Sequence, residues 1–315
     1  MQVFTDLADV PADFGPSVVT IGKFDGVHLG HRAILDRLLT AAAADGLTSV
    51  VVTFDRNPLA TLRPDARPKS LLGASVKADR LAEIGVDACL LLHFDTAFAA
   101  LPPEEFVERF LVAGMHARIV FVGSDFRYGH GGAGDVALLR RIGAERGFEV
   151  VEIDDVQPDG ERRVSSTWIR DLLQAGDVRA ATALLTRPPM VRGEVVHGLK
   201  RGRELDYPTA NLSPDLEGFI PADGVYAGVL TVAGTRMPAA ISVGDNPTFD
   251  GVAKKQVEAY VLDRTDLDLY GEVVDLEFVE RLRGMVAFEG IEKLIAQMDD
   301  DVARTRIILG HPGGS

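Results

Sequence analysis

Short apolar runs alternate with helix-like segments through the first 185 residues, and this alternation constrains the fold more than any other feature. The runs are SVVTIG (17–22), TSVVVTF (48–54), ACLLLHF (88–94), RIVFVG (118–123) and FEVVEI (148–153). Strands that are buried on both faces have this nearly unbroken Val, Ile and Leu composition. Segments with apolar residues at helical spacing lie between the runs. The pattern predicts a Rossmann-like α/β domain, with helices on both faces of a parallel sheet.

The pattern changes after TRPPM (186–190). Segments such as GVYAGVLTVAGTRMPAAISVG (224–244) and VVDLEFVERL (273–282) are typical of antiparallel strands joined by short turns. Residues 290–309 instead carry apolar side chains at helical spacing. The second half is therefore predicted to be a small antiparallel β-barrel with a terminal helix. The Pro-Pro pair at 188–189 is the expected linker, which gives two domains, 1–186 and 187–315.

Charge and composition limit the kind of ligand. The net charge is −14 and no basic stripe is visible, so we expect no nucleic-acid partner. No run reaches the ~18 apolar residues of a membrane span. With one cysteine, Cys89, and no leader-like N-terminus, the cytoplasm is the expected compartment. If the ligands are phosphorylated small molecules, local helix N-termini, a few arginines and a divalent metal must attract them.

Two histidines stand three residues apart directly behind the first apolar run, in TIGKFDGVHLGHRAIL (20–35). A zinc site would need a further ligand at a suitable spacing, which the chain does not offer here. The histidines could simply cap a helix, but Gly22, Gly26 and Gly30 allow close backbone approach to a ligand. Two imidazoles on one helical face, His28 and His31, suit hydrogen bonding to a phosphate group.

This arrangement resembles the nucleotidyltransferase superfamily, which includes adenylyltransferases and class I aminoacyl-tRNA synthetases. A second signature of that superfamily resembles RRVSSTWIR (162–170), where hydroxyl side chains begin a helix. Arg170 lies in the first turns of that helix and suits bidentate anion binding. The synthetase alternative is disfavoured because no anticodon-binding region or basic RNA surface is visible.

The string GKFDGVHLGH is more specific and resembles the adenylyltransferase module of the bacterial bifunctional riboflavin kinase/FMN adenylyltransferase family. TFDRNP (53–58) and VGSDFRYG (122–129) match further motifs in order. The resemblance implies catalytic roles for His28, His31 and Arg170. The nucleotide-binding residues that it implies are Gly22, Phe24, Asp25, Gly26, Gly30, Arg162, Ser165, Ser166 and Thr167. The flavin-binding residues that it implies here are Phe54, Pro58, Asp125, Phe126 and Tyr128.

The second half carries an independent match. GEVVHGLKRGRELDYPTANL (193–212) resembles the flavokinase signature. Thr209 and Asn211 are two apart on an extended segment, so their oxygens face one way and suit Mg²⁺ bound to ATP. The resemblance makes Glu258 the catalytic base and Arg283 a flavin-binding residue. Its nucleotide loop would contain Gly198, Arg201, Gly202 and Arg203.

Several positions depart from the family pattern. Arg56-Asn57 replace the usual Pro-His, and GHGGAG (129–134) lacks the usual Lys and Arg. Met285 stands where a glutamate is common, and Lys255-Gln256 where Arg-Thr is usual. We expect these changes to affect flavin affinity more than the type of reaction.

The resemblance implies a bifunctional enzyme of FAD biosynthesis. The C-terminal module would phosphorylate riboflavin to FMN, and the N-terminal module would adenylylate FMN to FAD and release pyrophosphate. Its substrates would be riboflavin, FMN and ATP, with Mg²⁺ as cofactor. The alternatives are a protein with one active module and a flavin- or nucleotide-binding regulator. The oligomeric state stays open, with a homo-oligomer among the options.

Overall fold

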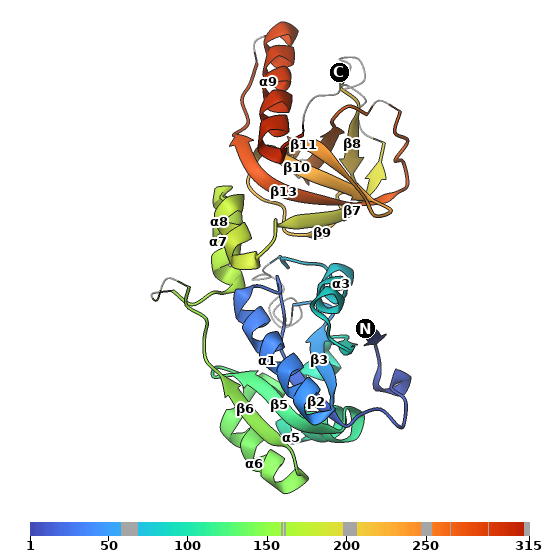
Figure 1. The fold of residues 1–315 in the computed structure, drawn as a ribbon, viewed down its shortest axis with the longest axis vertical. Helices are drawn as coiled ribbons and strands as arrows, with labels where there is room; N and C mark the ends of the chain where they lie inside the picture. Colours follow the sequence, from blue (N-terminus) through green and yellow to red (C-terminus); the bar gives the residue numbers. More distant parts are fainter. Residues whose placement is uncertain are drawn as a thin grey trace. The chain divides into compact units, whose positions relative to one another are not determined.

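The computed structural model describes residues 1–57, 69–158, 160, 162–197, 207–246, 254–264, 266–288 and 290–311. The chain divides into two compact units, Met1–Ser166 and Thr167–Ser315. Each unit has its own sheet and its own core, drawn from blue to green and from yellow to red in Figure 1.

The N-terminal unit is built on a six-stranded sheet in the order β1-β4-β3-β2-β5-β6, with every neighbouring pair parallel. The strands are β1 (Gln2–Phe4), β2 (Ser17–Ile21), β3 (Thr48–Phe54), β4 (Ala88–Leu92), β5 (Ala117–Gly123) and β6 (Glu149–Ile153). The predicted parallel α/β fold is confirmed. The sequence analysis missed β1, which pairs with β4 at the edge of the sheet.

Helices cover both faces of this sheet. They are α1 (Leu29–Asp45), α3 (Ala74–Ile84), α4 (Thr96–Ala99), α5 (Pro103–Phe106) and α6 (Val136–Arg146), with the π-helical η3 (Val107–Gly114) and the short 3-10 turns η1 (Leu7–Asp9) and η4 (His130–Gly132). Val19 packs in a cluster with Leu111 and Leu139, whereas its neighbour Val18 packs with Leu38 of α1. Adjacent strand residues point to opposite faces, so each face has a core of its own.

The C-terminal unit is a closed antiparallel barrel. Six strands follow each other in the order β13-β10-β11-β12-β8-β7, and β7 pairs with β13 to close the ring. The short β9 pairs with β7. The strands are β7 (Met190–Val196), β8 (Thr209–Leu212), β9 (Glu217–Gly218), β10 (Gly224–Val232), β11 (Thr235–Asn246), β12 (Lys254–Val261) and β13 (Val273–Arg283). This confirms the predicted barrel.

Helix α9 (Ile291–Leu309) packs along β10 and β11, as Figure 1 shows. Two further helices group with the barrel: α7 (Ser166–Ala175) and α8 (Val178–Leu185), of which α8 contacts β13. The boundary between the two compact units therefore falls between residues 166 and 167 of the chain. The functional domain boundary at 186 and 187 stays a prediction.

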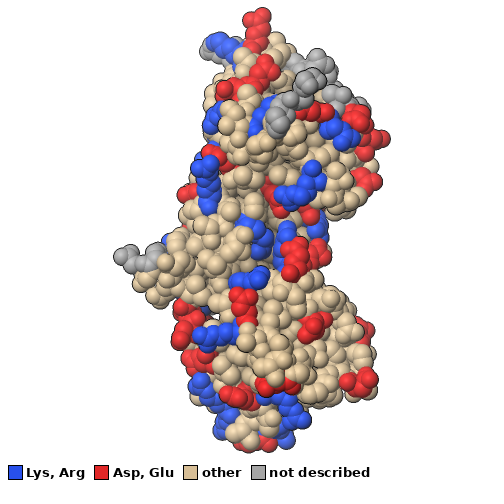
Figure 2. Space-filling view, viewed as in Figure 1, with Lys and Arg blue, Asp and Glu red and all other residues tan. Residues whose placement is uncertain are grey.

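Acidic and basic side chains are interspersed over the face of the molecule drawn in Figure 2. Many of them form ion pairs within one element or between neighbouring elements, such as Arg32 with Asp36 and Arg192 with Asp275. Among the described residues, no helix is both long and apolar enough to cross a membrane.

Candidate active sites

The first motif forms a tight turn between β2 and α1. The backbone enters the left-handed region at Phe24 (φ +46°), Gly26 (φ +90°) and Val27 (φ +42°). Phe24 and Val27 are nonetheless buried, with 1% and 2% of their surfaces exposed. Non-glycine residues reach such dihedrals only where the surroundings hold them. The turn is thus a fixed, strained structure at the carboxyl edge of the sheet, where α/β proteins bind ligands.

His28 and His31 lie together at the end of this turn. His28 is the N-cap of α1, and its backbone N–H donates to Nδ1 of His31 at 3.3 Å. The two rings stack with centroids 3.8 Å apart and an angle of 18° between their planes. A Cβ at Gly30 would lie 3.2 Å from Cε1 of His28, so glycine leaves room for the imidazole. The pairing that the spacing predicted is present.

The turn is tied to the second motif. The Ser166 hydroxyl donates to the Asp25 carbonyl at 2.8 Å, and a Cβ at Gly30 would be 3.9 Å from the Val164 carbonyl. Ser166 also begins α7. Thr167 and Arg170 follow within the first turns of α7, whereas Ser165 and Arg162 precede it. The structure therefore joins the His-containing turn to the serines of the second signature.

The Asp25 carboxylate has hydrogen-bonding partners within the protein. It accepts from the backbone N–H of Leu71 at 2.7 Å and of Leu72 at 3.4 Å, and the residue is 8% exposed. These bonds give Asp25 a structural task, which is to hold the turn against the segment before α3. A nucleotide-binding role for Gly22, Phe24 and Asp25 stays a prediction.

The predicted flavin residues of this unit lie near the same sheet edge but have packing partners. Phe54 ends β3, with its ring centroid 5.2 Å from that of Phe94. Phe126 stacks on Tyr128 at 5.3 Å. Tyr128 is 7% exposed and belongs to the core, and burial raises its pKa to about 12. The flavin role of these residues stays a prediction, and Pro58 lies outside the described residues.

The Asp125 carboxylate also forms an ion pair within the protein. It pairs with the Arg163 guanidinium at 2.7 Å, and this hydrogen bond holds the pKa of Asp125 below its ordinary value. Asp125 is therefore an anion that orients Arg163, at the start of the second signature. A direct contact between Asp125 and flavin stays a prediction.

In the barrel, Thr209, Asn211 and Glu258 form one cluster. β8 and β12 pair so that Glu258 stands opposite Asn211. The Asn211 amide donates to Oγ1 of Thr209 at 3.3 Å, and the Thr209 hydroxyl donates to Oε2 of Glu258 at 3.4 Å. Three oxygen-bearing side chains, two from β8 and one from β12, thus converge.

Burial dominates the electrostatics of Glu258. It raises the pKa of the carboxyl above the ordinary value, although the hydrogen bond from Thr209 acts in the opposite direction. A carboxylate with a raised pKa is a stronger base, and general bases work best when their pKa approaches the working pH.

Sequence reasoning missed the contact of Gln256 with this cluster, because it noted Gln256 only as a departure from the family. The Gln256 side-chain N–H donates to Oδ1 of Asn211 at 2.8 Å. Because Gln256 and Glu258 are two apart on β12, both side chains lie on the same face as the cluster. A spacing argument from Glu258 would have found it.

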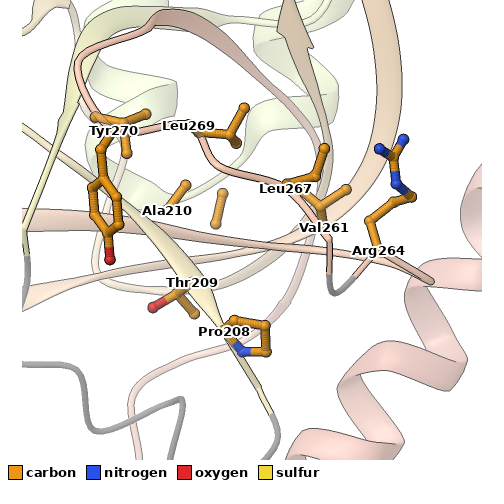
Figure 3. A pocket seen from close by; sticks show the side chains of 10 residues that line it. Pro208, Thr209, Ala210, Val261, Arg264, Leu267, Leu269 and Tyr270 are labelled. Atoms are coloured by element: carbon orange, nitrogen blue, oxygen red, sulfur yellow. The ribbon is translucent and has the colours of Figure 1, made fainter.

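A cavity of about 500 Å³ opens beside Thr209. Figure 3 shows it between the start of β8 and the segment that runs from Leu267 to Tyr270. Apolar side chains of Val195, Pro208, Ala210, Ala259, Val261, Leu267 and Leu269 line it together with Thr209, Arg264 and Tyr270, and polar and apolar atoms share its surface about equally. Small-molecule sites typically combine apolar side chains with a few polar groups.

Arg283 has a partner that sequence reasoning did not foresee. Its guanidinium binds the Asp301 carboxylate of α9, with Nε at 3.0 Å and Nη2 at 2.7 Å from Oδ2. The Asp301 side chain is 5% exposed. This bidentate pair fixes α9 to β13, and flavin binding by Arg283 stays a prediction. Gly198, Arg201, Gly202 and Arg203 lie outside the described residues.

Comparisons with known proteins match both units. The model of the FAD synthetase family matches residues 10–168, and that of the riboflavin kinase family matches residues 185–309. Relatives named bifunctional riboflavin kinase/FMN adenylyltransferase include those of Listeria monocytogenes (37% identity, 92% of this chain and 91% of the relative) and Pseudomonas fluorescens (37% identity, 98% of both).

A solved structure described as a macrolide-efflux protein from Streptococcus pneumoniae also resembles this chain. It has a TM-score of 0.85 and 33% identity, and the match covers 96% of this chain and 98% of the other.

Proposed function

The chain belongs to the bifunctional riboflavin kinase/FMN adenylyltransferase family, and from this premise we propose how its two units divide the chemistry. The C-terminal unit converts riboflavin to FMN, and the N-terminal unit converts FMN to FAD. The cluster of Thr209, Asn211 and Glu258 is the observation that carries the first assignment. The stacked pair of His28 and His31 supports the second.

In the kinase site, Glu258 acts as the general base. Its carboxylate accepts the proton of the riboflavin 5′-hydroxyl while the hydroxyl oxygen attacks the γ-phosphorus of ATP. The bond from that phosphorus to the β–γ bridging oxygen breaks, and ADP leaves. The raised pKa of Glu258 favours this role, and the Thr209 hydroxyl orients the carboxylate.

The donor set fits magnesium. Mg²⁺ binds hard oxygen ligands and usually takes few of them from the protein, because waters and substrate phosphates complete its coordination. The Thr209 hydroxyl and the Asn211 amide oxygen would hold it, beside the Glu258 carboxylate. When bound, Mg²⁺ neutralises charge on the phosphates of ATP.

The cavity beside Thr209 suits the nucleotide. Its apolar side chains can cover the adenine ring, and Thr209, which also lines it, belongs to the cluster that contains Glu258 (Figure 3). The phosphates would then lie near the cluster that contains Glu258. This arrangement also agrees with the net charge of −14, because attraction of ATP is local.

Gln256 gives a specific prediction. Ligand-orienting partners of a metal site typically contribute about 10–100-fold to metal affinity or activity. We expect Gln256→Ala to raise the Mg²⁺ concentration for half-maximal riboflavin phosphorylation about tenfold, because Asn211 loses the bond that fixes its amide. The measurement is a magnesium titration of the kinase reaction.

Lys255→Ala is the matched control, since Lys255 neighbours Gln256 but pairs with Asp223 at 2.9 Å. It should leave the magnesium requirement unchanged. An unchanged titration for Gln256→Ala would remove Gln256 from the metal site.

In the N-terminal unit, a phosphate oxygen of FMN attacks the α-phosphorus of ATP, and pyrophosphate leaves. The attacking phosphate is already charged, so no base is required. His28 and His31 donate hydrogen bonds to the charge that develops on the transferred phosphate, and the start of α1 adds its N-terminal dipole. Ser165, Ser166, Thr167 and Arg170 are proposed as the second group of phosphate ligands.

Truncated fragments test which unit carries which reaction. A fragment of residues 187–315 should phosphorylate riboflavin and form no FAD, because it contains Thr209, Asn211, Glu258 and α9. It lacks α8, however, which contacts β13 and has Leu184 and Leu185 buried. We therefore expect a lower melting temperature for residues 187–315 than for residues 167–315.

Both fragments should retain the kinase reaction. The assignment fails if residues 167–315 fold cooperatively but do not phosphorylate riboflavin, since the kinase site would then need residues from the N-terminal unit.

A further inference from the structure

A lysine is buried beneath the proposed adenylyl-transfer site. Lys77 lies in α3 on the same helical face as Leu81, and 7% of its surface is exposed. Lysines are almost never buried to this degree unless the ammonium group is fully paired. The mechanism proposed above gives Lys77 no part, so its position requires a separate explanation.

The ammonium group is fully paired. Nζ donates to the Phe54 carbonyl at 2.6 Å, to the Lys23 carbonyl at 3.1 Å and to Oγ1 of Thr53 at 3.2 Å. Three N–H groups therefore meet three oxygens. Lys23 belongs to the turn after β2, whereas Thr53 and Phe54 end β3. Lys77 thus joins two neighbouring strand ends at the ligand edge of the sheet.

The same segment of chain holds the turn at a second point. Leu71 and Leu72, which precede α3, donate their backbone N–H groups to the Asp25 carboxylate. Lys23 and Asp25 flank Phe24, whose φ of +46° is strained for a side chain of this size. The contacts at Lys23 and Asp25 therefore lie on either side of the strained Phe24, which is four residues before His28.

We propose that Lys77 is a positioning residue of the adenylyl-transfer site, which holds the turn Gly22–His28 in the geometry that places the imidazoles of His28 and His31. It also joins this turn to Phe54 at the end of β3, so one ammonium group contacts both the proposed nucleotide-binding turn and a proposed flavin-binding residue. The inference rests on the proposed function of the turn.

The charge of Lys77 makes this role dependent on pH. Burial lowers its pKa from 10.5 to about 8, and the titratable groups that face it are the carboxylates of Asp25 and Asp55 and the thiol of Cys89, whose own pKa burial raises to about 11. A neutral amine has two N–H groups, so one of its three acceptors would lose its donor. Positioning should therefore weaken as the pH rises through about 8.

Stability should change in the opposite direction. The folded protein releases this proton more readily than the unfolded chain, which therefore binds more protons between pH 8 and 10.5. Lys77 then makes the N-terminal unit more stable as the pH rises through this range, while adenylyl transfer falls. A residue that served only to stabilise the fold would not produce these opposite trends.

The test uses the full-length Lys77→Met and Lys77→Arg variants. Misplacement of reacting groups by about 1 Å can cost about 10²-fold in rate. We expect folded Lys77→Met to lower kcat for FAD formation from FMN and ATP by about 10²-fold. Its remaining activity should lack the alkaline decline of the wild type. Lys77→Arg should retain more activity and move the decline to higher pH.

Riboflavin phosphorylation by the same samples is the internal control and should stay at the wild-type level. Normal FAD formation by Lys77→Met, or an unchanged alkaline decline in Lys77→Arg, would overturn the proposal. If Lys77→Met does not fold, the proposal is tested by comparing the pH profiles of FAD formation by the wild type and by Lys77→Arg.

The two hypotheses can fail separately. If His28→Ala forms FAD normally, the function assigned to the turn is wrong. If His28→Ala loses FAD formation but Lys77→Met does not, only the role of Lys77 is wrong.

Discussion

The Glu258→Gln variant is expected to phosphorylate riboflavin about 10²–10⁴-fold more slowly than the wild type, which is the usual contribution of a general base. Glutamine preserves the size of the side chain and can still accept from the Thr209 hydroxyl, but it cannot take a proton. The measurement is the initial rate of FMN formation from riboflavin and ATP.

The pH profile of FMN formation gives a second test of the role of Glu258. Because burial raises the pKa of Glu258, the wild-type rate should fall as the pH decreases through this raised value, where the carboxylate becomes protonated. Glu258→Gln should lack this acidic decline. Glu272→Gln, which changes an exposed carboxylate in the same unit, is the control. A normal FMN rate in Glu258→Gln would show that another group accepts the proton.

The His28→Ala and His31→Ala variants are each expected to lose about 10²–10³-fold in FAD formation, by analogy with the removal of one oxyanion-hole donor. Either change removes one ring of the stacked pair and with it a donor to the transferred phosphate. The measurement is FAD formation from supplied FMN and ATP.

Riboflavin phosphorylation should be unchanged in both histidine variants, since Glu258 and its cluster lie in the other unit. His311→Ala removes a partly exposed imidazole of the barrel unit and should affect neither reaction. Wild-type FAD formation by both His28→Ala and His31→Ala would contradict the assignment of the first motif.

The architecture could be predicted where the pattern is long or strongly periodic. The central strands β2 and β3 are buried on both faces, which leaves unbroken apolar runs. Strand β1 escaped prediction because three residues are too few to show a period. The boundary at 186 and 187 differs from the division into compact units because α8 packs on β13, and sequence alone does not show which core a helix joins.

The candidate sites were predictable where chemistry follows local spacing. The stacking of His28 on His31 follows from residues three apart at a helix start, and the common face of Thr209 and Asn211 from residues two apart in a strand. Partners distant in sequence were not predictable. Nothing near Arg283 in the sequence indicates that Asp301 binds it.

The burial of Lys77 could not be predicted from the sequence for another reason. A lysine beside apolar residues of a helix normally has its ammonium group in water, and only the fold places three oxygens around it.

A single time course tests the central claim, that one chain carries both reactions. The full-length protein is incubated with riboflavin, ATP and Mg²⁺, and FMN, FAD, ADP and pyrophosphate are measured separately. We expect FMN to appear first and FAD to follow, with one ADP formed for each riboflavin phosphorylated and one pyrophosphate for each FAD. A protein that binds flavin and ATP but forms neither FMN nor FAD would be a regulator, and that result would contradict the claim, as would the formation of FMN with no FAD even when FMN is supplied.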